Sequence, residues 1–296
     1  MKKLAFIFNP KSGKGKIENH LVDIINVFSK ADYEITVVPT KGKNYCSDYI
    51  KNEGKRFEVV VVSGGDGTVN EAFNGLMTIE ANYRPALGYI PMGTTNDFAS
   101  SSTIPTDPFQ AAKSIAEGYD MRIDAGKFND RYFSYIAAFG AFTRVSYDTP
   151  QQIKNIFGHA AYVVEGIRSL SEIKSARLKL QTAEGTIEDE FIFGMVANSK
   201  SVGGFKIKSM DIDLSDGLFE VILIKKVEKA TDINTIVSDL MNKKTVSDYY
   251  YVFKTDKIRI TSDESIAWTL DGEFGGKISE AVIENIPEAI RIRNIG

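Results

Sequence analysis

Early in the chain, a run of apolar residues leads directly into glycines: Glu58-Val-Val-Val-Val-Ser-Gly-Gly-Asp-Gly-Thr-Val-Asn-Glu71. The β-branched run predicts a strand over 57–63 that is buried on both faces, as in a parallel sheet. Three glycines in the next four residues are hard to explain by packing. They predict a tight turn whose N–H groups face phosphate oxygens, with Asp66 suited to hold magnesium. A strand-to-helix turn without function is the alternative.

Around this segment, short apolar runs alternate with stretches that repeat apolar residues at helical spacing. The pattern is typical of an α/β domain with a parallel sheet, and we place this domain at residues 1–124. In such sheets, ligands bind beyond the carboxyl ends of the strands. Predicted strands cover 4–8, 34–39, 57–63 and 86–91, and predicted helices cover 17–28, 45–52, 69–77 and 108–117.

From about residue 125 the predicted strands follow one another closely, around turn signals such as Asn129-Asp130 and Glu184-Gly185. Short turns favour antiparallel pairing, so residues 125–285 are predicted to form a mostly β domain. The sequence leaves open whether the closing segment 286–296 returns to the first domain. Predicted strands cover 122–128, 132–142, 176–181, 186–197, 217–225, 249–261 and 265–270, and predicted helices lie near 158–171 and 230–242.

The composition excludes several classes of protein. Of the 296 residues, 43% are hydrophobic, 24 are Gly and 8 are Pro, which excludes disordered and collagen-like chains. The formal charge of −3 excludes a surface-wide polycation, so no nucleic-acid partner is expected and any anion site must be local. The single cysteine, Cys46, is interpreted as a packing residue in a reducing cytoplasm. No apolar run approaches the ~18 residues of a membrane span.

Two further loops follow predicted strands of the first domain. The segment Asn9-Pro10-Lys11-Ser12-Gly13-Lys14-Gly15-Lys16 combines lysine and glycine without acid, which favours an anion site or, alternatively, a solvated turn. It matches neither the Walker A pattern nor the dinucleotide fingerprint. The segment Met92-Gly93-Thr94-Thr95-Asn96-Asp97-Phe98 offers hydroxyls and an amide that either cap a helix or contact a nucleotide. We expect all three loops to build one anion site at one edge of the sheet.

Two segments of the second domain that carry carboxylates each have two interpretations. Asp271-Gly272-Glu273 is a strong hairpin signal, and alternatively it supplies a carboxylate that acts as a general base. The stretch from Asp211 to Leu218 is either a hairpin turn or a site for a hard cation, built from a carboxylate and backbone carbonyl groups. His20 and His159 lie in or near predicted helices, so neither a zinc site nor a histidine-dependent triad is expected.

The order of four motifs carries a resemblance to a known family. With Asn9-Pro-x-Ser-Gly13, Gly64-Gly-Asp-Gly-Thr68, Gly93-Thr-x-Asn-Asp-Phe98 and Asp271-Gly-Glu273, the sequence resembles the bacterial soluble diacylglycerol kinases over essentially its whole length. This family is related to sphingosine and ceramide kinases and, more distantly, to NAD kinases. The resemblance implies a three-layer α/β N-terminal domain of the phosphofructokinase and NAD kinase type, a C-terminal β-sandwich, and ATP in the cleft between them.

The resemblance also implies roles for individual residues. Glu273 would be the general base, and Lys14 would face phosphate. Asp66 and Asp97 would belong to the acidic network around a catalytic Mg²⁺ ion. The residues implied to contact ATP are Asn9, Pro10, Lys11, Ser12, Gly13, Thr40, Gly65, Asp66, Gly67, Thr68, Val69, Asn70, Glu71 and Thr94.

The second domain is implied to hold a structural magnesium ion. Its ligands would be Asp216 together with carbonyl or side-chain groups of Asp213 and Leu218. A homodimer is a further expectation that rests on the resemblance alone.

These features predict transfer of the ATP γ-phosphoryl group to the hydroxyl of diacylglycerol, giving phosphatidic acid. Relatives often carry basic residues where this chain has Asn19, Ser100 and Glu165, so we expect apolar contact with a neutral lipid. The enzyme would be cytoplasmic and would contact the inner face of the membrane peripherally and transiently. The alternatives are another acceptor, such as a sphingoid base, a polyprenol or NAD, or nucleotide binding without catalysis. The β-rich second domain favours a lipid over NAD.

Overall fold

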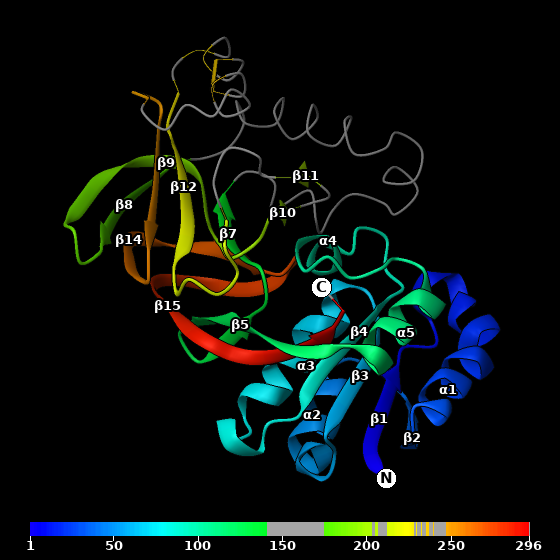
Figure 1. Cartoon of the computed structure of the whole chain (residues 1–296). Coiled ribbons are helices and arrows are strands. Elements are labelled where there is room, and N and C mark those ends of the chain that lie inside the picture. The colour runs from blue at the N-terminus through cyan, green and yellow to red at the C-terminus, as the bar shows by residue number, and fades with distance from the viewer. Residues whose placement is uncertain are drawn as a thin grey trace. The chain divides into compact units, whose positions relative to one another are not determined.

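Figure 1 shows the computed structural model of the chain, which divides into two compact units. The first unit contains Met1–Ala125, Tyr132–Ser134 and Ile286–Gly296, and the second contains Gly126–Arg131 and Tyr135–Asn285. The structure describes residues 1–140, 175–202, 205–206, 212–227, 229, 232, 235–236, 239 and 247–295. Outside these residues lie the predicted helix at 158–171, most of the helix at 230–242, the end of the strand at 132–142, and Asp211, His159 and Glu165.

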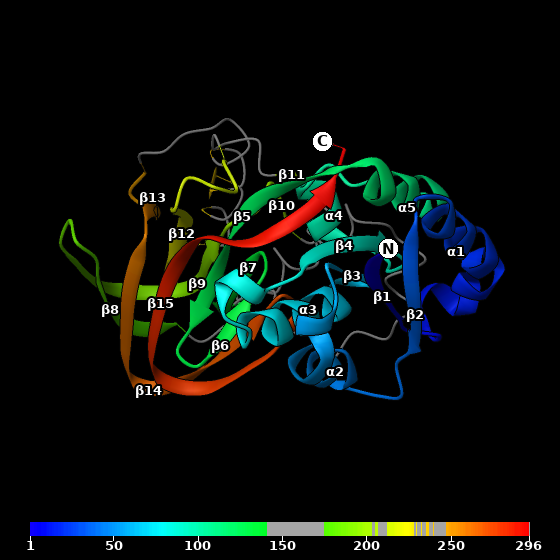
Figure 2. The same ribbon diagram turned by 60° about the horizontal axis from the view of Figure 1, so that its bottom comes forward.

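A parallel sheet forms the centre of the first unit (Figure 2). Strand β3 is buried along its whole length, because its run of valines places apolar side chains on both faces. Each strand pairs in parallel with its neighbour, so the carboxyl ends of all four strands lie at the same edge. In order across the sheet the strands are β2 (Tyr33–Pro39), β1 (Lys2–Phe8), β3 (Val59–Gly64) and β4 (Ala86–Pro91).

Helices cover both faces of this sheet, as right-handed crossovers from β1 to β2 and from β3 to β4 require. α1 packs with α5, and α2 packs with α3. The first turn of α5 is fixed by Asp107, whose carboxylate accepts a hydrogen bond from the Gln110 amide (2.9 Å). The helices are α1 (Leu21–Lys30), α2 (Tyr45–Glu53), α3 (Asp66–Met77), α4 (Asp97–Ser101) and α5 (Pro108–Glu117), with 3₁₀ turns η1 (Ser12–His20), η2 (Gly54–Arg56) and η3 (Ala81–Tyr83).

The predicted helix over 17–28 forms in two parts. Its beginning belongs to η1, and α-helical geometry starts only at Leu21. Gly13, near the start of η1, adopts a left-handed φ of 59°. No helix in the described part of the chain combines the length and the apolar character needed to cross a membrane.

The second unit is built on antiparallel strands. Its apolar core includes Ile192, Met195, Ile222 and Tyr250. In order across the sheet the strands are β13 (Tyr250–Thr255), β12 (Phe219–Lys225), β9 (Thr186–Ala197), β7 (Ile136–Gly140), β14 (Lys257–Leu270) and the first part of β15 (Glu273–Asn294), and β8 (Ala176–Gln181) pairs with β9 and β14. Smaller pairings are those of β5 (Tyr119–Phe128) with β15 and β6 (Arg131–Phe133), and of β10 (Ser201–Val202) with β11 (Phe205–Lys206).

β15 is the longest strand in the described part of the chain, with 22 residues. The chain leaves the second unit after Asn285, and the closing segment from Ile286 belongs to the first unit. There, Ile292 pairs in parallel with Leu87 of β4. The carboxylate of Asp120 in β5 receives hydrogen bonds from two arginines of β15, so the end of the strand is held by charge as well as by pairing.

The single strand predicted over 132–142 is wrong, because the described part is divided into β6 and β7. The amides of Tyr135 and Ile136 at the break donate to the same carboxylate oxygen of Asp271 (2.9 and 3.0 Å). A side chain far along the chain therefore replaces the strand pairing at this point.

The strand predicted over 249–261 is also divided, with β13 ending at Thr255 and β14 beginning at Lys257. β14 then continues through the strand predicted separately at 265–270. The Thr255 hydroxyl donates to the carbonyl group of Lys257 (2.9 Å) and closes the turn. Asp256 is a typical turn residue, but without glycine or proline beside it the sequence contains only a weak signal for this turn.

Candidate functional site

In the first unit, two loops follow neighbouring strands of the parallel sheet. The Asp66 loop (residues 64–68) joins β3 to α3, and the Asn96 loop (residues 92–97) joins β4 to α4. The amide of Met92 donates to the carbonyl oxygen of Gly64 (2.7 Å), so the pairing of the two strands continues into the loops.

The two loops touch through glycine backbone. A Cβ atom on Gly93 would lie 2.6 Å from the Cα atom of Gly65 and 2.7 Å from Oδ1 of Asn96. A Cβ atom on Gly64 would lie 2.2 Å from the Thr68 hydroxyl oxygen. Gly65 has a φ of −93°, which any residue can adopt. The expectation that packing does not explain these glycines is therefore wrong for Gly64, where close contact and not left-handed backbone excludes a side chain, while a Cβ atom on Gly65 would lie 3.3 Å from the Cα atom of Gly93.

We expect Gly93→Ala to destabilise the first unit by about 1–3 kcal/mol, the usual cost of forcing extra volume into a packed region. Gly42→Ala is the control, because a Cβ atom there would meet nothing within 4 Å. Denaturant unfolding of the full chain measures both effects. Equal stability of the two variants would show that the loop contact is not tight.

Asp66, the first residue of α3, turns its carboxylate toward the Asn96 loop. The Thr95 hydroxyl donates to Oδ2 (3.0 Å), and the Phe98 amide donates to Oδ1 (3.2 Å). Burial raises the pKa of Asp66, the charge of Asp97 raises it further, and the hydrogen bonds oppose this rise. Asp97 begins α4 and is 2% exposed. The sheet edge therefore carries two acidic groups with hard oxygen atoms, suited to a cation that accompanies phosphate.

The raised pKa of Asp66 determines the sign of its effect on stability. The folded chain holds the Asp66 proton more firmly than the unfolded chain, so Asp66 lowers stability increasingly as pH rises through its folded pKa. We expect Asp66→Asn to raise the thermal midpoint at pH 7, with the gain disappearing toward the unfolded pKa of about 3.9. Asp107→Asn is the control, because asparagine also caps helices well. A gain that does not depend on pH would contradict the assignment.

The Asn9 loop (residues 9–16) and Thr40 lie at the same edge of the sheet. The amide of Asn9 donates to the carbonyl oxygen of Ser63 (2.9 Å), and the amide of Thr40 donates to that of Phe8 (2.9 Å). The Asn9 carboxamide accepts from the Lys11 amide (2.9 Å), which closes the turn. The three loops thus meet at one edge, as the strand order predicts. The side chain of Lys14 lies outside the described part of the chain.

Three of the predicted ATP-contacting residues have side chains that are buried or hydrogen-bonded to other parts of the chain. Val69 is fully buried, and the side chain of Asn70 is buried as well. The Glu71 carboxylate accepts hydrogen bonds from the amides of Asn44 (2.8 Å) and Cys46 (3.1 Å), which fixes the start of α2. Sequence patterns missed this capping role because the partners are more than twenty positions apart. Thr94, also in the predicted set, is exposed in the Asn96 loop.

In the second unit, Asp271 and Gly272 form the turn between β14 and β15, with φ values of 50° and 82°. These left-handed values are those of a tight hairpin, so the structural interpretation of Asp-Gly is confirmed. Asp271 is buried, and its Oδ1 atom accepts from two backbone amides. The Glu273 side chain is exposed. Glu273 therefore offers the accessible carboxylate of this motif.

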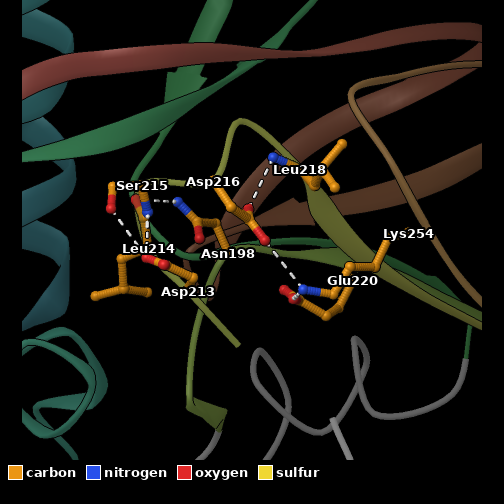
Figure 3. A network of polar contacts seen from close by, with 8 residues as sticks. All are labelled: Asn198, Asp213, Leu214, Ser215, Asp216, Leu218, Glu220 and Lys254. Atoms are coloured by element: carbon orange, nitrogen blue, oxygen red, sulfur yellow. Dashed lines mark hydrogen bonds and ion pairs between the residues drawn. The ribbon is translucent and has the colours of Figure 1, made fainter. Parts of the chain in front are cut away.

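Figure 3 shows the loop that contains Asp213 and Asp216. Asp213 Oδ1 accepts from the amide (3.0 Å) and the hydroxyl (2.9 Å) of Ser215. Asp216 Oδ1 accepts from the Leu218 amide (3.0 Å). Both carboxylates thus stabilise local turns. Within the described ranges no three His, Cys, Asp or Glu side chains are grouped to hold a metal ion, so a cation here would depend on Asp216 and backbone oxygen atoms.

Lys254, which sequence reasoning missed, joins this loop to a buried acid. Its ammonium group lies 3.0 Å from Asp216 Oδ2 and 3.1 Å from Glu220 Oε1 (Figure 3). Glu220 is 0% exposed, and burial raises its pKa to about 7 although Lys254 opposes the shift. Glu220 and Lys254 are direct cross-strand partners on β12 and β13, so their ion pair can be recognised only once the strand pairing is known.

Comparison with known proteins defines the class of the molecule. A family model of the diacylglycerol kinase catalytic domain matches residues 3–128. A model of the YegS C-terminal NAD kinase beta sandwich-like domain matches residues 137–294. The chain is thus a kinase with an α/β catalytic domain followed by a β sandwich-like domain, which confirms the predicted fold class. It belongs to the diacylglycerol kinase family, as the four motifs predict.

Similar proteins extend over nearly the whole chain. A diacylglycerol kinase of Bacillus subtilis (strain 168) is 32% identical over 280 residues, 94% of this chain and 92% of that protein. One from Staphylococcus aureus (strain MRSA252) is 35% identical, over 94% of this chain and 88% of that protein. A solved structure of a diacylglycerol kinase from Bacillus anthracis str. Sterne has a TM-score of 0.82 at 26% identity, covering 99% of this chain and 97% of that one. These likenesses support a lipid kinase, and kinases use ATP, usually with a divalent metal.

Proposed function

We propose that this enzyme transfers the γ-phosphoryl group of ATP to the hydroxyl of diacylglycerol and releases phosphatidic acid and ADP. The contact between the Asp66 loop and the Asn96 loop carries the proposal. It gathers backbone amides and a buried acid at the sheet edge where α/β proteins bind nucleotides. The relatives named diacylglycerol kinase supply the choice of acceptor.

Phosphoryl transfer depends on positioning and charge neutralisation. The amides of residues 65–67 at the start of α3 are assigned to the triphosphate, together with Lys14 and the Asn9 loop. Asp66 and Asp97 are assigned to a magnesium ion, which when bound would neutralise charge on the phosphate oxygens. Their hard oxygen atoms are ligands that magnesium prefers, and a cation there would offset the burial and the charge repulsion that raise the pKa of Asp66.

Glu273 is assigned the role of general base. The hydroxyl oxygen of the lipid forms a bond to the γ-phosphorus atom, the bond from that phosphorus to the bridging oxygen of ADP breaks, and Glu273 takes the hydroxyl proton. The neighbouring Asp271 is unsuited to this task because its carboxylate is buried against two backbone amides. Glu273 keeps an exposed carboxylate on the same hairpin.

A structural magnesium ion at the Asp216 loop is a separate part of the proposal. The carboxylate of Asp216 and backbone carbonyls are the oxygen ligands that magnesium prefers. Lys254, 3.0 Å from Asp216 Oδ2, fixes this carboxylate in place. Any such ion would therefore share Asp216 with the ammonium group, and its role would be to hold the loop.

We assign the enzyme to the cytoplasm, with transient contact at the inner face of the membrane. Asn19 and Ser100 are exposed and uncharged. They add no positive charge that would attract anionic lipid, which favours a neutral acceptor held by apolar contact.

The test is ADP release by the purified full chain with ATP and magnesium against diacylglycerol, monoacylglycerol, sphingosine, undecaprenol and NAD. We expect diacylglycerol to give the highest rate, with phosphatidic acid identified by mass spectrometry. Glu273→Gln should lower turnover by about 10²–10⁴-fold, the usual contribution of a general base. Glu264→Gln is the matched control, because Glu264 is an exposed carboxylate elsewhere on the β14–β15 hairpin.

Each outcome bears on a different part of the proposal. Full turnover by Glu273→Gln would remove this residue from the mechanism. A higher rate with another acceptor would change the substrate, and ATP binding without ADP release on any acceptor would indicate a nucleotide-binding protein without catalysis.

A further inference from the structure

Tyr89 interrupts the otherwise apolar strand β4 and is fully buried. Its hydroxyl lies 3.0 Å from the carbonyl oxygen of Gly64 and 3.1 Å from Oδ1 of Asn96. One acceptor belongs to the Asp66 loop and the other to the Asn96 loop. The single phenol proton can be donated to either oxygen, so Tyr89 links the two loops from its position in strand β4.

Asn96 determines the shape of its loop. Its Oδ1 atom accepts from the Gly93 amide (2.8 Å), and its amide group donates to the Gly93 carbonyl oxygen (3.1 Å). The residue adopts a left-handed φ of 50° and makes no side-chain cap on α4, so the capping interpretation of this amide is wrong. Tyr89 therefore contacts the side chain that holds Gly93 against Gly65.

The surroundings of Tyr89 keep its hydroxyl in place and neutral. Its ring packs at an angle against Phe98, with ring centroids 5.9 Å apart, and Phe98 packs edge-on against Phe73 of α3. Burial, followed by the charges of Asp66 and Asp97, raises the pKa of Tyr89 well above its ordinary value. The phenol thus remains a proton donor throughout the physiological pH range.

Removal of the hydroxyl would leave the other bonds of both loops intact. The Gly64 carbonyl oxygen keeps the Met92 amide (2.7 Å), and Asn96 Oδ1 keeps the Gly93 amide (2.8 Å). The strands would remain paired, but the restraint that joins Asn96 to the Asp66 loop would be lost. The expected defect therefore lies in the spacing of the loops more than in the folding of the unit.

We infer that Tyr89 is a positioning residue that fixes the spacing between the Asp66 loop and the Asn96 loop, and so preforms the surface that binds the ATP phosphates. The inference rests on the proposed function, because it takes these loops as the phosphate site. Tyr89 acts from below the loops and is not assigned any contact with ATP. A preformed surface avoids the entropic cost of ordering the two loops when ATP binds.

The test compares Tyr89→Phe with Tyr33→Phe. Tyr33 is also buried in the first unit, and its hydroxyl accepts from Arg293 (2.9 Å) at the amino end of β2, away from both loops. Calorimetric titration with a non-hydrolysable ATP analogue and magnesium gives Kd, and steady-state kinetics give KM for ATP and kcat. We expect Tyr89→Phe to raise Kd and KM about three- to tenfold, the range of one hydrogen bond, and Tyr33→Phe to leave both unchanged.

A second variant separates positioning from folding. Asn96→Gly keeps the left-handed backbone and removes the side chain that Tyr89 contacts. By itself, Asn96→Gly should weaken ATP binding. Adding Tyr89→Phe to this variant should raise Kd by a smaller factor than Tyr89→Phe does in the wild-type chain. This variant also tests the inference if Tyr89→Phe does not fold.

Wild-type affinity in Tyr89→Phe would overturn the inference, as would a loss of thermal stability without a change in Kd. A full additional loss on the Asn96→Gly background would overturn the route through Asn96. Absence of ATP binding by the wild-type chain would instead contradict the proposed function, so the two failures are distinguishable.

Discussion

The candidate site depends on the contact between the backbones of Gly65 and Gly93. Any side chain at Gly93 would collide with Gly65 or with the Asn96 carboxamide that closes the loop. The contact is possible because β3 and β4 are parallel neighbours, so their carboxyl ends emerge together and Met92 can bond to Gly64. The buried valines of β3 stabilise the sheet, and the sheet aligns the two loops. The loops then present backbone amides and acidic side chains at one edge.

This arrangement brings Asp66 and Asp97 together in a partly buried environment. The pKa of Asp66 is raised by burial and then by the charge of Asp97, so the ionised form of Asp66 is disfavoured in the folded chain. A cation that accompanies ATP would favour the ionised form, which supports the assignment of both acids to the proposed site. Asp271 shows the contrasting case, since two backbone amides bind its carboxylate and leave it a structural role beside the exposed Glu273.

Sequence patterns predicted what depends on neighbours along the chain. The buried strand β3, the α/β class, the Asp-Gly hairpin at Asp271 and the meeting of three loops at one edge follow from local periodicity and turn chemistry. Contacts between distant segments escaped prediction: the capping of α2 by Glu71, the break before Ile136 that Asp271 fills, and the bond from Lys254 to Asp216. The contacts of Tyr89 in β4 also escaped prediction, because its partners become neighbours only after β3 and β4 pair.

In the proposed mechanism, the Asp66 loop and the Asn96 loop form a single surface for the ATP phosphates. Amide hydrogen exchange of the full chain, measured over a titration with ATP and magnesium, tests it directly because each loop is observed separately. Exchange should slow in residues 64–69 and 92–98 together, with the same midpoint concentration of ATP. Protection confined to one loop, or protection elsewhere with both loops unchanged, would contradict it.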